Sequence, residues 1–336
     1  MPLVEYPVRH VVIDSERDGQ RVDNFLLGQF KGVPKSFVYR ILRRGEVRAN
    51  GKRIKPEYRL AAGDELRLPP VRIEEAPVIA PSENLDIVRR LAESVIYETP
   101  EMLVINKPAG VAVHGGSGVD YGVIEALRSG RGDLKYLELV HRLDRDTSGC
   151  LMIAKKRSAL RCLHEQLRLK TMHKHYWALV HGRWPSKVTV VNEPLLKNVL
   201  KSGERFVRVD RNGKPSCTDF EVIKDFENAS LVMASPRTGR THQIRVHCAF
   251  KHHPIVMDEK YGDREMDSFF ARSGLRRMFL HARTIVFSDP GTGKQTTVDA
   301  PLDEHLQSFL DRLGARNSGD CGNDSEGSSE SKGKEF

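Results

Sequence analysis

The chain has 336 residues, 39% of them hydrophobic, and a formal net charge of +9. This length suffices for a large core plus one smaller module. Apolar runs are short and interrupted by charge, so we expect no membrane-spanning helix and no membrane partner. The start lacks a secretory signal pattern, and the five cysteines lack metal or disulfide spacing, which predicts reduced thiols and a cytoplasmic location.

Acidic residues gather near the C-terminus. Residues 317–336 carry five acidic and two basic side chains, so the remainder of the chain has a net charge of +12. Such an excess predicts a polyanionic partner, and nucleic acid is favoured over a membrane because no basic helix with a broad apolar face is present. We expect residues 316–336 to form a disordered acidic tail.

Residues 16–70 have the composition of a small basic domain, with thirteen basic residues against seven acidic ones. Apolar residues at helical spacing predict helices over 22–30 and 36–44, the second ending at Gly45. The dipeptide Asn50-Gly51 is a strong hairpin signal. A two-helix face beside a basic hairpin can bind RNA phosphates by charge and shape. The residues expected to do so are Arg40, Arg43, Arg44, Lys52 and Arg53.

The order of features in this module, from Arg21-Val22-Asp23 through the Arg-rich helix and hairpin to Gly63-Asp64, resembles the S4 RNA-binding domain. After Pro69-Pro70, residues 71–88 are rich in proline and acid and are expected to be a linker. A second domain is predicted over 89–315.

This second domain begins with a sheet pattern. Strands are predicted over 95–97 and 102–105, followed by a glycine-rich loop that contains His114. The loop lacks the spacing of a phosphate-binding motif, so a loop that lines a cleft is the preferred interpretation. Further along, we expect a helix over 158–169 and a strand over 174–180.

A stretch of nine residues, 141–149, is dense in charged and polar side chains and stands between two apolar runs. Asp144 lies between Arg142 and Arg145, which should keep its carboxylate ionised. A partly buried charged cluster is a candidate functional site, whereas an ordinary ion-paired turn is the alternative. Asp146, which begins the segment Asp-Thr-Ser-Gly, is better suited to hydrogen bonds within a turn than to a catalytic role.

A second polar cluster, 238–247, contains Arg240, His242 and Arg245. If the segment is helical after Thr241, then Thr241, Arg245 and Cys248 share one face, and Arg245 can point into a cleft. His242 and His247 lack an accompanying carboxylate, so no metal site is expected. Segments 195–209 and 216–222 are predicted to pair as antiparallel strands, 278–287 to return to the sheet, and 302–313 to form a closing helix.

Three segments together, His141-Arg142-Leu143-Asp144, Lys174-His175-Tyr176 and 238–247, resemble the signature motifs of the RluA family of pseudouridine synthases. The similarity extends almost end to end, apart from the acidic tail. It implies an α+β chain: a small α/β S4 domain, then a catalytic domain on a large mixed, mainly antiparallel sheet with flanking helices. It also implies isomerisation of uridine in large-subunit (23S) ribosomal RNA, without cofactor or metal, by a protein expected to be a monomer.

Carried over by motif, Asp144 is the catalytic carboxylate, acting on the ribose or on the base. Arg245 would pair with it and Tyr176 would stack on the flipped uracil. Arg142 would fill the gap left in the RNA, because a target nucleotide must leave its stack before reaction. The remaining residues expected to contact RNA are His114, Arg240 and His242.

Two other functions fit parts of the sequence. A retaining nucleosidase could use Asp144 and Asp146 as a carboxylate pair. A non-enzymatic ribosome-binding protein would explain the basic module but leaves the larger part of the chain without a role.

Overall fold

The computed structural model describes residues 3–30, 33–74, 86–115, 121–134, 136–199 and 205–319. It divides into two compact units, Met1–Ala80 and Pro81–Phe336. The division falls within the segment 71–88. Among the described residues, no helix is both long and apolar enough to cross a bilayer.

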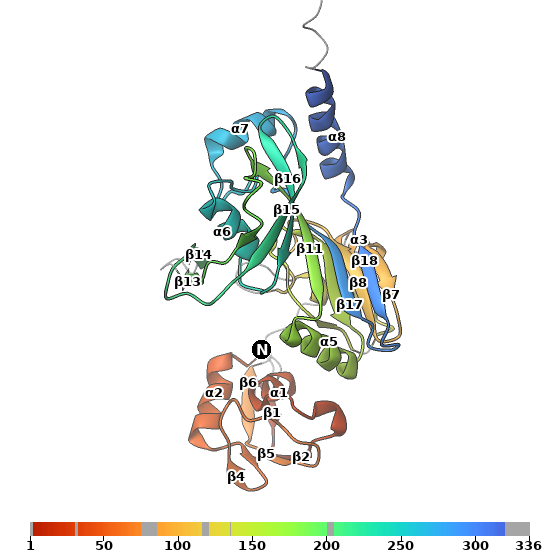
Figure 1. The fold of residues 1–336 in the computed structure, drawn as a ribbon. Helices are drawn as coiled ribbons and strands as arrows, with labels where there is room; N and C mark the ends of the chain where they lie inside the picture. The colour runs from red at the N-terminus through yellow and green to blue at the C-terminus, as the bar shows by residue number, and fades with distance from the viewer. Residues whose placement is uncertain are drawn as a thin grey trace, which may run out of the picture. The chain divides into compact units, whose positions relative to one another are not determined.

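The first unit packs two helices on a small antiparallel sheet of strand order β2-β5-β3-β4 (Figure 1). Its core is one apolar cluster in which Val22, Leu26 and Phe30 meet Val38 and Leu42, as helical spacing predicts. The elements are β1 Leu3–Tyr6, β2 Arg9–Val12, α1 Val22–Gln29, α2 Lys35–Arg44, β3 Arg48–Ala49, β4 Lys52–Arg53, β5 Glu65–Leu68 and β6 Val71–Glu74.

Two local predictions in this unit are confirmed. Helix α2 ends at Gly45, whose φ of 72° lies in the left-handed region that glycine adopts without strain. Asn50 and Gly51 have φ of 50° and 76° and join β3 to β4 as a tight hairpin. The guanidinium of Arg53 donates to the backbone carbonyl of Arg43 at 2.8 Å, which holds the hairpin beside the helix.

The expected linker begins with a strand instead. Residues Val71–Glu74 form β6, which pairs antiparallel with β1 in the register Leu3↔Glu74 to Tyr6↔Val71. Proline and acid content indicated a linker, but the partner strand lies 65 residues earlier in the chain, where local composition carries no information about it. The first unit therefore includes this segment.

The second unit is built on a large sheet whose main path is β12-β15-β16-β11-β17-β10-β8-β7 (Figure 1). Among the described strands, the β10–β17 pair is parallel and its neighbours are antiparallel. This confirms the predicted α+β class with a mixed, mainly antiparallel sheet. The remaining elements are α3 Asp86–Glu93, β7 Val95–Glu98, β8 Met102–Lys107, α4 Val123–Gly130, β9 Glu138–Leu139, β10 Ser148–Ala154, α5 Arg157–Leu169, β11 His173–His181, β12 Val190–Val191, β13 Leu195–Val199, β14 Arg205–Val209, β15 Thr218–Asp225, β16 Ala229–Pro236, α6 Gln243–Phe250, α7 Arg264–Arg272, β17 Leu280–Ser288, β18 Gln295–Asp299 and α8 Glu304–Gly319.

The middle of this sheet is buried. Every residue of β10 is inaccessible, and β8, β11 and β17 contribute to the same hydrophobic core. Strands covered on both faces read as continuous apolar runs, which is the pattern of Cys150–Ala154. The core therefore gives the loops at the ends of β10 and β11 a rigid base.

Three predictions in this unit are wrong. Segment 195–209 does not pair with 216–222; instead β13 pairs with β14, and β15 joins the main sheet beside β16. Thr241 precedes helix α6, which begins at Gln243 after a left-handed His242 with φ of 53°. Helix α8 continues to Gly319, so the first four residues of the expected tail are helical. Residues 320–336 lie outside the described residues.

Candidate active site

The loop that carries Asp144 is held by a buried lysine at the end of β8. The ammonium of Lys107 is inaccessible and donates to the carbonyl oxygens of Pro108, Val111 and Arg145 at 2.8, 2.9 and 3.0 Å. Burial lowers the pKa of Lys107 to about 7. The Arg145 carbonyl also accepts from the N–H of Gly110 at 2.9 Å. Two donors thus fix the backbone next to Asp144.

After the loop, β10 runs very close to β17. Gly149 has a φ of 106°, and a Cβ at this position would lie 2.2 Å from the carbonyl oxygen of Ala282. Glycine is required for this approach. The close pairing fixes where the loop leaves the sheet.

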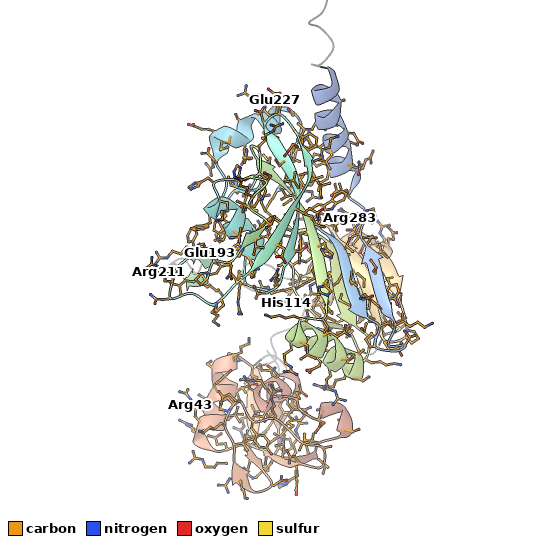
Figure 2. All side chains as sticks on the ribbon, in the orientation of Figure 1. Arg43, His114, Glu193, Arg211, Glu227 and Arg283 are labelled. Carbon is orange, nitrogen blue, oxygen red and sulfur yellow. The ribbon has the colours of Figure 1, made fainter. Side chains whose placement is uncertain are left out.

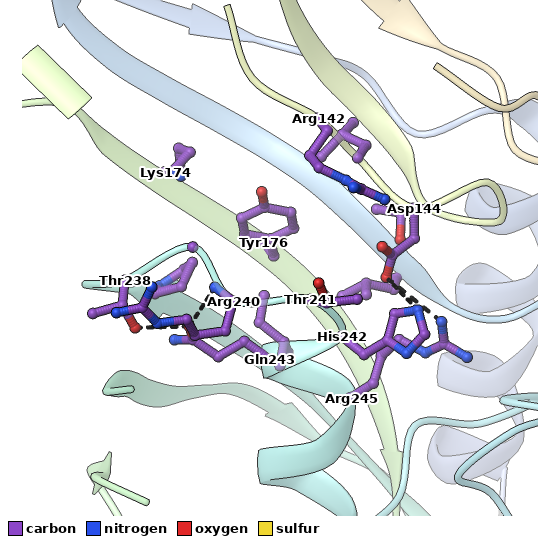
Figure 3. A pocket seen from close by; sticks show the side chains of 16 residues that line it. Arg142, Asp144, Lys174, Tyr176, Thr238, Arg240, Thr241, His242, Gln243 and Arg245 are labelled. Atoms are coloured by element: carbon purple, nitrogen blue, oxygen red, sulfur yellow. Dashed lines mark hydrogen bonds and ion pairs between the residues drawn. The ribbon is translucent and has the colours of Figure 1, made fainter. Parts of the chain in front are cut away.

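The carboxylate of Asp144 faces a guanidinium and an imidazole (Figure 3). Nη1 of Arg245 lies 3.5 Å from Oδ2 of Asp144, and Nε2 of His242 lies 3.9 Å from the same oxygen. The flanking arginines are not its described partners: Arg145 pairs with Asp146 at 3.1 Å, and Arg142 is exposed. The two arginines that flank Asp144 in the sequence are therefore not the cations described beside its carboxylate in the structure.

Arg245 is itself held by a buried acid. Its Nε and Nη2 donate to the two carboxylate oxygens of Asp258 at 2.8 and 2.7 Å, and Asp258 is 1% exposed. The guanidinium also lies over the ring of Tyr261, 5.1 Å from its centroid. A bidentate pair fixes the plane of a guanidinium. Nη1 is consequently the nitrogen directed at Asp144.

A hydrogen-bonded chain orients His242. The backbone N–H of Val207, on β14, donates to the hydroxyl of Tyr261 at 3.1 Å, and this hydroxyl lies 2.7 Å from Nδ1 of His242. If the hydroxyl donates to Nδ1, the imidazole proton resides on Nε2 and faces Asp144. Burial lowers the pKa of His242 to about 4, against the opposing charge of Asp144. This arrangement favours a neutral histidine at pH 7.

Tyr176 lies at the back of the pocket, on β11. Its neighbours across the sheet are Ala234 and Ala282, which leave room for the ring, and the register with β17 shifts between His175 and Tyr176. Such bulges re-aim side chains near active sites. Burial, with the charge of Asp144 adding to it, raises the pKa of the Tyr176 phenol. The phenol therefore stays protonated at neutral pH.

The pocket that these residues line has a volume of about 110 Å³. A water molecule needs roughly 10–15 Å³ measured in the same way, so the space is large enough for one planar ring. Its walls combine Asp144 and Tyr176 with Lys174, Arg142 and the 238–245 segment (Figure 3). A carboxylate beside a small cavity suits chemistry on a single inserted ring.

Gln243 holds one wall of the pocket in place. Its amide oxygen accepts from the Thr238 hydroxyl at 2.7 Å and from the N–H of Arg240 at 3.0 Å, while its nitrogen donates to Cys217 and Thr218 at 2.9 Å each. The loop before α6 is thereby tied to β15. Arg240 remains exposed at the rim of this wall.

The structure brings together Asp144, Tyr176, Arg245, Arg142, Arg240 and His242 around the pocket. His114 is exposed and is not among the residues that line it (Figure 2). The five expected RNA contacts of the first unit are all exposed on α2 and its neighbouring hairpin; they are Arg40, Arg43, Arg44, Lys52 and Arg53.

Sequence reasoning missed Lys107, Asp258, Tyr261 and Gln243. Lys107 could have been found from the sequence, because a lysine at the end of an apolar strand is costly to bury unless its ammonium is hydrogen-bonded. Gln243 lies within the recognised 238–247 cluster. Asp258 and Tyr261 carry no local signal, since the side chains they hold, Arg245 and His242, lie more than ten residues earlier in the chain.

Comparisons with known proteins identify the family of this chain. Residues 101–250 match the family described as RNA pseudouridylate synthase, and residues 20–66 match the S4 domain. The chain is 58% identical over 308 residues to ribosomal large subunit pseudouridine synthase C of Escherichia coli K12, covering 91% of this chain and 97% of the relative. The namesake from Pasteurella multocida is 55% identical over 311 residues, covering 93% and 95%.

Solved structures give the same result. The human RNA pseudouridylate synthase domain containing 4 superposes with a TM-score of 0.56 at 25% identity, covering 68% of this chain and 95% of that one. The human domain containing 1 superposes with a TM-score of 0.52 at 26% identity, covering 72% and 98%.

Proposed function

Because this chain belongs to the RNA pseudouridylate synthase family and carries an N-terminal S4 domain, we propose that it converts uridines of large-subunit ribosomal RNA into pseudouridine. The observation that carries the proposal is the Asp144 carboxylate, set against Arg245 and His242 in a pocket sized for one ring. We place the reaction in the cytoplasm, with the protein acting as a monomer.

The reaction breaks the N1–C1′ bond of uridine, turns the uracil and joins C5 to C1′; in balance, the hydrogen of C5 is lost and N1 gains one. Positive character develops at C1′ as the bond to N1 breaks. The Asp144 carboxylate stabilises or traps it, as carboxylates do in glycosyl transfer. Arg245, fixed by Asp258, keeps the carboxylate oriented. His242, whose Nε2 lies 3.9 Å from the carboxylate, adds a polar group there without adding a full charge.

Tyr176 supplies the face on which the uracil stacks. Its raised pKa keeps the ring neutral, so the hydroxyl is suited to hydrogen bonding and not to service as an ionised base. Arg142 stands exposed at the pocket rim, on the same loop as Asp144. We assign it to the space that the flipped nucleotide vacates in the RNA.

The two other functions are disfavoured by particular contacts. Asp146 pairs with Arg145 and does not line the pocket, which removes the second carboxylate that a nucleosidase needs. A purely structural ribosome-binding role leaves the Asp144–Arg245 arrangement without a use.

Mapping pseudouridines in ribosomal RNA tests the proposal. In cells that lack this protein we expect defined uridines of the large-subunit RNA to stay unmodified, and expression of the wild-type chain to restore them. Chains with Arg142→Ala or Tyr176→Leu are expected to restore them poorly. An unchanged pseudouridine map without the protein would refute the function, and full restoration by either variant would remove that residue from the site.

The exposed arginines of α2 give a second prediction. Replacing Arg40, Arg43 and Arg44 together by Gln should weaken binding to ribosomal RNA on the order of tenfold or more and reduce the salt dependence of log Kd by about one unit per lost phosphate contact. Arg72→Gln, an exposed arginine of the same unit paired with Glu5 at 2.9 Å, is the matched control. Filter binding over a range of salt concentrations measures both; equal losses in the two proteins would contradict a specific docking surface.

A further inference from the structure

A second hollow adjoins the active-site pocket. It has a volume of about 550 Å³, against about 110 Å³ for the active-site pocket. The two share one wall, made by Arg142, Lys174, Pro236, Thr238 and Gly239. We call the larger hollow the side groove; apart from Arg142 on the shared wall, none of its residues has a catalytic or RNA-binding role assigned above.

The side groove has an apolar floor and a basic rim. Val140 and Met172 are buried beneath it, with the partly buried Leu167 packed beside them. Lys170 is exposed at its edge, at the C-terminal end of α5, and His173 is exposed at the start of β11. Apolar surface with adjoining cations is the combination that single-stranded nucleic acid requires: bases stack and phosphates are neutralised.

The acid in the groove does not cancel this charge. Asp219 is the carboxylate among the residues that line it, and it accepts from Nε and Nη2 of Arg237 at 2.7 Å each. His175 is held by a 2.7 Å contact between its Nδ1 and the Ser235 hydroxyl, and burial lowers its pKa. Lys170, Lys174 and Arg142 therefore leave the groove with an unbalanced positive charge.

Lys174 is the most informative of these cations, because it lines both hollows. It is partly buried, burial lowers its pKa, and no described carboxylate lies close enough to oppose that effect. Its charge instead contributes to lowering the pKa of the neighbouring His141. A half-buried ammonium without an anion is costly, and an arriving phosphate would supply the missing partner.

We propose that the side groove is a second nucleotide site, which binds the RNA residue next to the target uridine. The shared wall sets the geometry: a strand whose uridine enters the active-site pocket and whose next nucleotide enters the side groove passes over Lys174. The phosphate between the two nucleotides then lies on Lys174, the neighbouring base lies on the apolar floor, and Lys170 receives the next phosphate. This inference rests on the proposed function and adds a binding site to it.

Binding of an in vitro transcript of large-subunit ribosomal RNA tests the site. Lys174→Met and Lys170→Gln should each raise Kd on the order of 5- to 10-fold and lower the salt slope of log Kd by about 1. Lys224→Gln is the matched control: this exposed lysine lies at the opposite end of β15 from Asp219, with its ammonium 5.3 Å from the ring centroid of Phe226. It should change neither quantity.

The stability of the Lys174→Met variant shows whether Lys174 binds RNA or stabilises the folded protein. Since the Lys174 ammonium lacks a described anionic partner, Lys174→Met should leave the urea midpoint of the free protein unchanged or raise it, while RNA binding falls. A lowered midpoint with unchanged affinity would overturn the site, as would unchanged salt slopes in both variants. The proposed function is tested separately, by measuring pseudouridine formation by the wild-type protein. The binding measurements do not depend on whether pseudouridine forms.

Discussion

Asp144→Asn is expected to abolish pseudouridine formation while RNA binding survives. The substitution keeps the size of the side chain but removes the charge that faces Arg245 and His242. Loss of the group that stabilises or traps C1′ should lower kcat by on the order of 10⁴-fold or more, as removal of a nucleophile does in other enzymes. Single-turnover assays on ribosomal RNA measure the chemistry, and filter binding measures affinity.

Asp146→Asn is the matched control. It removes the same charge two residues away, from a carboxylate paired with the exposed Arg145, and should keep most of the activity. Retained turnover by Asp144→Asn would exclude this residue as the catalytic carboxylate. Release of free uracil by the wild type would instead point to the nucleosidase reaction.

Arg245→Met is expected to damage both stability and activity. It leaves Asp258 buried and unpaired, and breaking such a pair costs about 3–5 kcal/mol of the free energy of unfolding. It also removes the nitrogen that lies 3.5 Å from Asp144. A misplaced catalytic group of this kind loses on the order of 10²-fold in rate. Urea unfolding and single-turnover kinetics measure the two effects.

The double variant Arg245→Met/Asp258→Leu separates the two roles of Arg245. Replacing both members of a buried pair by apolar residues is often neutral, so the free energy of unfolding should recover in part. Recovery stays incomplete because Oδ1 of Asp258 also accepts from the backbone N–H groups of Lys260 and Tyr261, at 3.0 and 3.2 Å. Activity should stay low, because Asp144 still lacks its cation. Recovery of activity together with stability would show that Arg245 acts only in holding the fold.

The sequence predicted most elements whose signals are local. The helices over 22–30 and 36–44 follow from apolar spacing, and the hairpin at Asn50-Gly51 follows from turn chemistry. The errors occur where a partner is distant along the chain: β6 pairs with β1, and β13 pairs with β14 instead of β15. Strand pairing depends on packing across the whole sheet, which a local window does not contain.

The same division applies to the active site. Two polar clusters in the sequence pointed to Asp144, Arg245 and His242, and the family resemblance added Tyr176 and gave the roles, because residue types and their order can be read directly from the chain. The resemblance also paired Asp144 with Arg245, but only the tertiary structure showed how that pair is held, with the guanidinium of Arg245 beside Asp144 and the adjacent Arg145 paired with Asp146 instead. The reason is physical: a buried charge is stabilised by groups that are close in space and shielded from water. The fold supplies such groups from Asp258, Tyr261 and Lys107. The sequence around these three residues gives little indication that they belong to the site.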